Sequence, residues 1–180
     1  MWVDLNLRNE VEIHHKLRKK DSIVFRFPRL FNPIKKAKDE GIFYYIRMEL
    51  CDMDLAEYLK ERGGFLAEDE ARVVMKNILA SVKIMKEQSV LHRDLKLENI
   101  LVQKSGQMNT NYYKICDFGC AEVLKDGEFS CSDSGTPRYF PPEMLNKEPK
   151  VSHGMDVWAL GIIYYQLLFG FHPFGRPFPD

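Results

Sequence analysis

The chain has 180 residues, a length that fits one domain with a substantial buried core. Its 26 basic residues (Lys and Arg) equal its 26 acidic residues (Asp and Glu), so zero net charge points to neither a nucleic-acid nor a membrane partner. Four cysteines, at positions 51, 116, 120 and 131, form no C-x-x-C pair, and the first residues are too polar for a secretory signal. These features favour a cytoplasmic protein with reduced thiols, with the nucleus as an alternative.

A helix is predicted from about residue 4 to residue 18, because residues at helical spacing form one face: Leu7, Val11, His14 and Leu17. Glu10 shares that face, and an inward carboxylate requires a cationic partner. Glu12 is the neighbouring candidate on the solvent side. Two β-rich runs, at residues 23–27 and 42–48, then predict strands separated by a polar stretch at 35–41.

Helices dominate the remaining pattern. A short helix is predicted up to Arg62, where two glycines end it. Residues 68–87 form the clearest amphipathic helix, with one apolar face made of Ala71, Val74, Ile78, Val82 and Met85. The apolar run at 157–171 is short for a membrane span, so we expect a buried core helix there.

Polar motifs occur in a fixed order. Residues 92–99 read HRDLKLEN, Asp117-Phe118-Gly119 follows, and then come GTP at 135–137 and PPE at 141–143. This set resembles the protein kinase signature, H-R-D-L-x-x-x-N followed by D-F-G. The resemblance implies an α+β, two-lobed protein kinase-like fold. Residues 1–50 would be a remnant of the small lobe, with its helix and last strands, and residues 51–180 a mainly helical large lobe, incomplete at its C-terminal end.

The same resemblance implies ATP-dependent phosphoryl transfer to Ser or Thr of protein substrates, with Mg²⁺ as cofactor. Asp94 would accept the proton of the substrate hydroxyl. Asn99 and Asp117 would bind Mg²⁺ through oxygen atoms. Lys96 would contact the γ-phosphate, and Thr136 would bridge Asp94 and Lys96, an arrangement that fits Ser/Thr rather than Tyr substrates.

The ATP-binding residues that the resemblance implies are Glu10, Met48, Glu49, Cys51, Asp54, Leu101 and Cys116. Glu10 would pair with a strand lysine, Met48 would be the gatekeeper, and the backbone from Glu49 to Cys51 would form the hinge that binds adenine. Asp54 is the better candidate for the ribose hydroxyls, while Asp52 is either the alternative or the cap of the short helix. Leu101 would form the floor of the pocket. Cys116 would line it, and we expect an electrophile in this site to alkylate that thiol.

Further residues are assigned regulatory or structural roles by the resemblance. Arg93 would bind a phosphate on the activation loop, placed there by an upstream kinase or by the chain itself, and Ser132 is the candidate acceptor. Phe118 and Gly119 belong to the metal-binding motif, and His92 would pack against Phe118. Asp156 would anchor the backbone of residues 92–99, and Glu143 would expect an arginine partner.

The family's glycine-rich loop and strand lysine are not found ahead of Glu10, and the sequence stops soon after the apolar run at 157–171. From this we expect a fragment that is marginally folded and catalytically weak or inactive. The alternative is a non-catalytic, pseudokinase-like scaffold or interaction module. Retention of four residues that decayed relatives tend to lose argues against that alternative: Asp94, Lys96, Asn99 and Asp117.

Overall fold

The structure, a computed structural model, describes residues 2–20, 26–38, 41–105, 110–125, 128, 134–145 and 151–175. Its elements in chain order are α1 (Trp2–Lys20), β1 (Leu30–Lys38), β2 (Gly41–Met48), β3 (Met53–Asp54), α2 (Leu55–Glu61), α3 (Glu68–Glu87), β4 (Val90–Leu91), the 3₁₀ turn η1 (Leu97–Asn99), β5 (Ile100–Lys104), β6 (Asn111–Ile115), β7 (Glu122–Val123), the 3₁₀ turns η2 (Pro137–Tyr139) and η3 (Pro142–Leu145), and α4 (Gly154–Phe169). This mixture of helices and small sheets agrees with the predicted α+β class.

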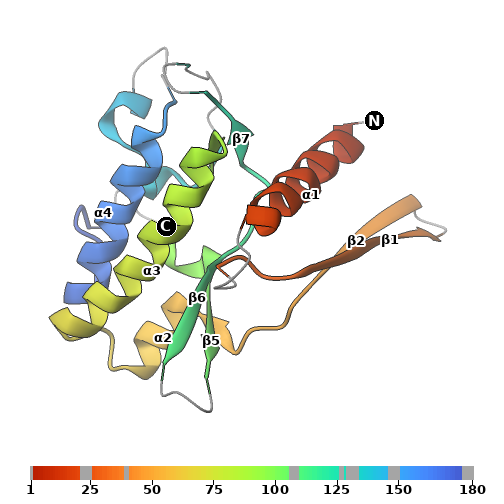
Figure 1. Cartoon of the computed structure of the whole chain (residues 1–180). Coiled ribbons are helices and arrows are strands. Elements are labelled where there is room, and N and C mark those ends of the chain that lie inside the picture. Colours follow the sequence, from red (N-terminus) through yellow and green to blue (C-terminus); the bar gives the residue numbers. More distant parts are fainter. Residues whose placement is uncertain are drawn as a thin grey trace.

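α1 and the β1–β2 hairpin lie on one side of the molecule, and α2, α3 and α4 lie on the other (Figure 1). α1 includes the helix predicted at residues 4–18 and ends in basic residues, which the helix dipole favours there. Hydrogen bonds from its side chains attach it to the rest of the fold, among them those of Asn9 and Lys16. Asn9 Nδ2 donates to the carbonyl of Ala121 at 3.2 Å, and Lys16 Nζ donates to the carbonyl of Gln88 at 2.8 Å.

The prediction of a strand at 42–48 is confirmed by β2. The prediction at 23–27 is wrong for Arg26 and Phe27, which lie outside any strand, while residues 23–25 fall outside the described part of the chain. The partner of β2 is β1, which includes much of the polar stretch that we expected to be a connection. Main-chain bonding to β2 keeps this segment extended, and no alternation of apolar residues indicates such a strand in the sequence.

α3 matches its predicted bounds and buries the predicted face, with Val82 only partly covered. α4 begins three residues earlier than predicted, at Gly154, and ends before Gly170. Gly170 has a φ of 79°, the left-handed conformation that commonly ends a helix. A Cβ atom there would lie 2.5 Å from the carbonyl oxygen of Gly64, so the close approach also requires glycine.

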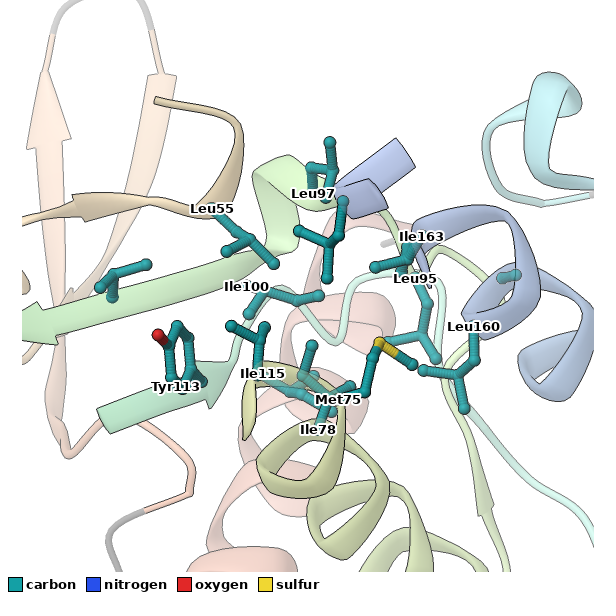
Figure 2. Packing of buried hydrophobic residues seen from close by; sticks show 14 of the residues in the cluster. Leu55, Met75, Ile78, Leu95, Leu97, Ile100, Tyr113, Ile115, Leu160 and Ile163 are labelled. Carbon is teal, nitrogen blue, oxygen red and sulfur yellow. The ribbon is translucent and has the colours of Figure 1, made fainter. Parts of the chain in front are cut away.

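The core lies where α2, α3 and α4 meet the sheet of β3, β5 and β6 (Figure 2). Leu55 of α2, Ile78 of α3 and Ile163 of α4 are at most 1% exposed. Ile100 of β5 and Ile115 of β6 are fully buried against them. Hydrophobic burial therefore fixes the two ends of the loop at residues 92–99, between β4 and β5.

None of the described helices is both long and apolar enough to cross a lipid bilayer. The lobe boundary at residues 50 and 51 stays a prediction.

Candidate active site

The loop from His92 to Asn99 is attached to α4. The backbone N–H groups of His92 and Arg93 donate to the Asp156 carboxylate at 2.9 and 3.0 Å. Asp156 lies in the first turn of α4 and is 3% exposed. Arg93 has a φ of 70°, which is uncommon for a residue with a side chain and persists only where the surroundings hold it. The helix thus sets the direction in which the loop presents Asp94.

Three polar side chains meet around Asp94. Lys96 Nζ lies 2.8 Å from Asp94 Oδ2 and 2.9 Å from Thr136 Oγ1. The Thr136 hydroxyl donates to Asp94 Oδ1 at 2.5 Å. Asn99 Nδ2 donates to the backbone oxygen of Asp94 at 2.8 Å and to its Oδ2 at 3.1 Å. The structure therefore brings together predicted residues that are up to 42 positions apart in the chain.

Charge is balanced inside this cluster. Burial raises the pKa of Asp94, but hydrogen bonds from Lys96 and Thr136 outweigh burial and bring the pKa below its ordinary value. Burial lowers the pKa of Lys96, but the bond and charge of Asp94 reverse that change and raise it. Both groups are charged at neutral pH. The Asp94 carboxylate can accept a proton, while Lys96 supplies a positive charge next to it.

The neighbouring residues Asp117 and Phe118 differ in burial. Asp117 is exposed and has a φ of 63°, and the Gly119 N–H donates to its Oδ1 at 3.3 Å. Phe118 is fully buried, with ring centroids 5.1 Å from His92 and 5.3 Å from His14. The Phe118 side chain thus anchors the segment while the Asp117 carboxylate stays at the surface.

Glu10 of α1 faces the same place. A Cβ atom on Gly119 would lie 3.3 Å from Asp117 Oδ1 and 3.9 Å from Glu10 Oε2, so both carboxylates lie beside this glycine. Burial and the charge of Asp117 both raise the pKa of Glu10, and no described cation lowers it. Glu12 is exposed. Of the two candidates on this helix, Glu10 is the one placed to meet a cation.

The donor set fits a hard cation. The side-chain amide nitrogen of Asn99 donates to Asp94, so among the described contacts its side-chain oxygen Oδ1 is left for a ligand. Asp117 offers an exposed carboxylate beside Glu10. Oxygen ligands of this kind suit Mg²⁺, and a cation here would offset the repulsion between the two carboxylates.

The expected hinge follows β2. Met48 is 41% exposed, and the Glu49 N–H donates to the carbonyl of Arg29 at 2.7 Å. The Glu49 carboxylate accepts from Lys114 Nζ at 2.7 Å and from the N–H of Arg29 at 3.0 Å. Burial raises the pKa of Glu49, but these bonds, with Lys114 first, bring it below its ordinary value. The Glu49 N–H is therefore already bonded within the chain, and adenine binding by the backbone from Glu49 to Cys51 stays a prediction.

Cys116 lies at the centre of the other predicted ATP-binding residues. Burial, with a contribution from Asp117, raises the pKa of its thiol to about 12, and weaker effects come from Cys51, Asp54 and Glu10. Its Sγ is 3.5 Å from the carbonyl oxygen of Asn99. At neutral pH this thiol is protonated and only 7% exposed, which disfavours the expected reaction with an electrophile.

Asp54 pairs with Leu101 across the β3–β5 ladder, which brings these two predicted residues together. Asp54 is also the N-cap of α2, where its Oδ1 accepts from the Glu57 N–H at 2.8 Å and Glu57 returns a bond in a capping box. Asp52 instead accepts from the Lys104 N–H at 2.8 Å. The expectation that Asp52 caps this helix is therefore wrong, since Asp54 is the residue at the helix start.

Arg93 already has an anionic partner. Its Nε donates to the carbonyl of Cys120 at 2.5 Å, and its Nη1 lies 3.0 Å from Glu122 Oε2. Sequence reasoning missed Glu122. Glu122 is the first acidic residue after Asp117, but no local pattern marks it as the partner of Arg93, whose burial only the structure shows. Ser132 lies outside the described residues, and Glu143 is exposed.

Comparison with known proteins gives consistent matches. The family model described as "Protein kinase domain" matches residues 2–177. "Serine/threonine protein kinase OSK3" of Oryza sativa subsp. indica is 37% identical over 131 residues, covering 72% of this chain and 25% of the relative. "Carbon catabolite-derepressing protein kinase" of Candida tropicalis is 36% identical over 150 residues, covering 83% and 23%. "Probable serine/threonine-protein kinase CCRP1" of Zea mays is 34% identical over 169 residues, covering 93% and 25%. This chain spans about a quarter of the length of these curated relatives.

Proposed function

This chain belongs to the protein kinase family, and on that premise we propose that it transfers the γ-phosphoryl group of ATP to Ser or Thr of protein substrates. One observation carries the proposal: Asp94 and Lys96, on the loop attached to α4, form a closed set of hydrogen bonds with Thr136. Phosphoryl transfer depends mainly on positioning and on charge stabilisation, and this cluster supplies both.

Each residue of the cluster has a separate task. Asp94 accepts the hydrogen bond and then the proton of the substrate hydroxyl, because its low pKa keeps it ionised until the transfer. Lys96 offsets negative charge on the phosphoryl oxygens. Thr136 bonds to both residues and keeps their separation constant. This bridging arrangement supports Ser/Thr rather than Tyr as the acceptor.

The family implies ATP and Mg²⁺. Asn99 and Asp117 would hold the metal ion, and Glu10 would lie close to it. ATP would occupy the space around Cys116, between Met48, the backbone from Glu49 to Cys51, and the other predicted contacts, Asp54 and Leu101. Bound Mg-ATP supplies the phosphoryl group and neutralises part of its charge.

Regulation and cellular context follow from the same premise. Phosphorylation of Ser132, by an upstream kinase or by the chain itself, stays a prediction, with Arg93 as the residue that would respond to it. The three described cysteines are free, which supports the cytoplasm, with the nucleus as the alternative. Zero net charge supports protein substrates rather than nucleic acid or membrane as partners.

A non-catalytic interaction module is the second candidate, and the unpaired carboxylate of Glu10 favours it. Without a cation beside it among the described residues, this part of the nucleotide clamp is incomplete. A thermal-unfolding titration with Mg-ATP separates the two candidates, since a ligand of the folded state raises the Tm. The kinase reading predicts a Tm that increases with Mg-ATP concentration, and a Tm that does not respond supports the module.

The function itself is tested by incubating the purified chain with Mg-ATP carrying a labelled γ-phosphate and a mixed set of Ser, Thr and Tyr peptides. Phosphoamino-acid analysis should then find the label on serine and threonine. Label confined to tyrosine would refute the assigned acceptor class. An absence of label on every peptide would refute the activity of this 180-residue chain and agree with the weak or inactive fragment expected from its sequence.

A further inference from the structure

The guanidinium of Arg93 is enclosed by the chain that follows Asp117. Its side chain is 9% exposed, against 33% for Glu122. The 3.0 Å contact between Arg93 Nη1 and Glu122 Oε2 is ionic rather than a well-aligned hydrogen bond. Both atoms are inaccessible to solvent, and neither has a hydrogen-bond partner among the described residues. Each charge therefore depends on the other for compensation.

Glu122 is held in place by the sheet rather than by its own side chain. It belongs to β7, where it pairs with Leu91 of β4, directly ahead of the loop. Directly after β7, the Leu124 N–H donates to the carbonyl of Ser89, the residue before β4, at 2.7 Å. The backbone of Glu122 is thus held by β4, directly before the loop that begins at His92.

Arg93 in turn links three parts of the site. Its N–H donates to Asp156, its Nε donates to the carbonyl of Cys120, and its carbonyl oxygen contacts Gly135 so closely that a Cβ atom there would lie 2.5 Å away. Asp94 is the next residue. Arg93 therefore ties the residue before Asp94 to α4 and contacts Gly135, the residue before Thr136. A change in the charge balance at Arg93 affects the positions of both Asp94 and Thr136.

We propose that Glu122 is a positioning residue, a built-in anion that occupies the Arg93 site and keeps the loop of Asp94 ordered in the unmodified chain. This inference rests on the proposed function and deepens it. The carboxylate supplies at Arg93 the negative charge that an activation-loop phosphate would otherwise bring. The Arg93 site is thus an anion site with a resident occupant. Replacing Glu122 by a neutral residue removes the occupant's charge, which a phosphate from solution can then supply.

The experiment compares wild type with Glu122→Gln in thermal unfolding, in sodium phosphate and in sodium chloride of equal ionic strength. Glu122→Gln should have a Tm about 5 °C or more below wild type in chloride, because Arg93 keeps a buried, uncompensated charge. Inorganic phosphate should recover part of that loss in Glu122→Gln and change wild type much less. Adding Arg93→Gln should abolish the recovery. Glu68→Gln, which removes an exposed carboxylate paired with Arg72, is the matched control and should behave as wild type.

An unchanged Tm for Glu122→Gln, or equal phosphate effects on that variant and on wild type, overturns the proposal. A double-mutant cycle keeps it testable if Glu122→Gln does not fold. The double variant Arg93→Met/Glu122→Met should be more stable than the sum of the losses in the two single variants predicts. Additive losses would contradict the proposal.

Kinetics add a readout that general loss of structure would not give. Glu122→Gln should lower kcat for phosphotransfer at an unchanged KM for ATP, and inorganic phosphate should restore part of kcat. If wild type transfers no phosphate at all, the proposed function fails, and the phosphate-dependent unfolding still decides the role of Glu122.

Discussion

At the scale of single residues, Glu10 has an environment that disfavours its own charge. Burial and Asp117 raise its pKa above the ordinary value of 4.5. The folded chain therefore binds a proton more tightly than the unfolded chain does, and stability falls as the pH rises from 4.5 through the raised pKa.

Replacing Glu10 by glutamine should accordingly increase the free energy of unfolding at pH 7. The advantage should shrink as the pH falls toward 4.5, where the wild-type carboxyl group is protonated as well. Urea unfolding at several pH values measures the difference. Glu12→Gln, on the exposed side of the same helix, should show little change, and a Glu10→Gln variant less stable than wild type at pH 7 would contradict the account.

The thiol of Cys116 gives a second prediction at this scale. With a pKa of about 12, only about one thiol in ten thousand is ionised at pH 8. Iodoacetamide at pH 8 should therefore label Cys51 and Cys120, which are less buried, before Cys116. Peptide mass spectrometry over time gives the order. Labelling of Cys116 ahead of both would show that burial does not control its reactivity.

Among single residues, those of the contiguous motifs could be predicted from the sequence, and Glu122 could not. Asp94, Lys96 and Asn99 are close in the chain, so their spacing alone indicates a shared site. The contact between Glu122 and Arg93 exists because β7 pairs with β4, and no local pattern predicts a pairing of two-residue strands. The capping role of Asp54 was missed for a related reason, since capping depends on where the helix begins.

At the scale of elements, Asp54 tests how much its N-cap contributes to the stability of α2. Asp54→Ala should cost about 1 kcal/mol of unfolding free energy, because the Glu57 N–H loses its acceptor. Asp54→Asn should keep most of the stability, since asparagine caps helices nearly as well as aspartate. Chemical denaturation compares the variants. Equal losses in both would show that the negative charge, rather than the cap, stabilises α2.

α3 and β1 show why some elements can be predicted and others cannot. α3 buries one face along its whole length, so its apolar spacing carries the information that locates it. β1 belongs to a two-stranded hairpin whose only described sheet partner is β2. Its extended conformation comes from main-chain bonds to β2, which depend little on the side chains of β1.

At the scale of the whole molecule, α4 supports the site through its packing. Ile163 is fully buried and Val157 is 63% exposed on the same helix. Ile163→Ala should cost about 2–5 kcal/mol, because it leaves a cavity in the core. Val157→Ala should change stability by less than about 0.5 kcal/mol. Denaturation midpoints test this contrast, and similar losses for the two variants would contradict the packing of α4.

The whole-molecule arrangement was predictable as a fold class and only partly as geometry. The motifs indicated which residues belong to one site. Only the structure brings Glu10 of α1 near Asp117, and the loop at 92–99 to Asp156 of α4, because these contacts join parts of the chain far apart in sequence. Such contacts depend on how the core packs, which local periodicity does not encode.

The central claim is that Asp94 accepts the proton in a transfer of phosphate from Mg-ATP to serine or threonine. The most direct test is the rate of that transfer by wild type and by Asp94→Asn, with Asp69→Asn, an exposed change in α3, as the control. Asp94→Asn should lower the rate by about 10²- to 10⁴-fold and leave the chain folded, while Asp69→Asn should match wild type. An Asp94→Asn chain that transfers phosphate at the wild-type rate would contradict the account.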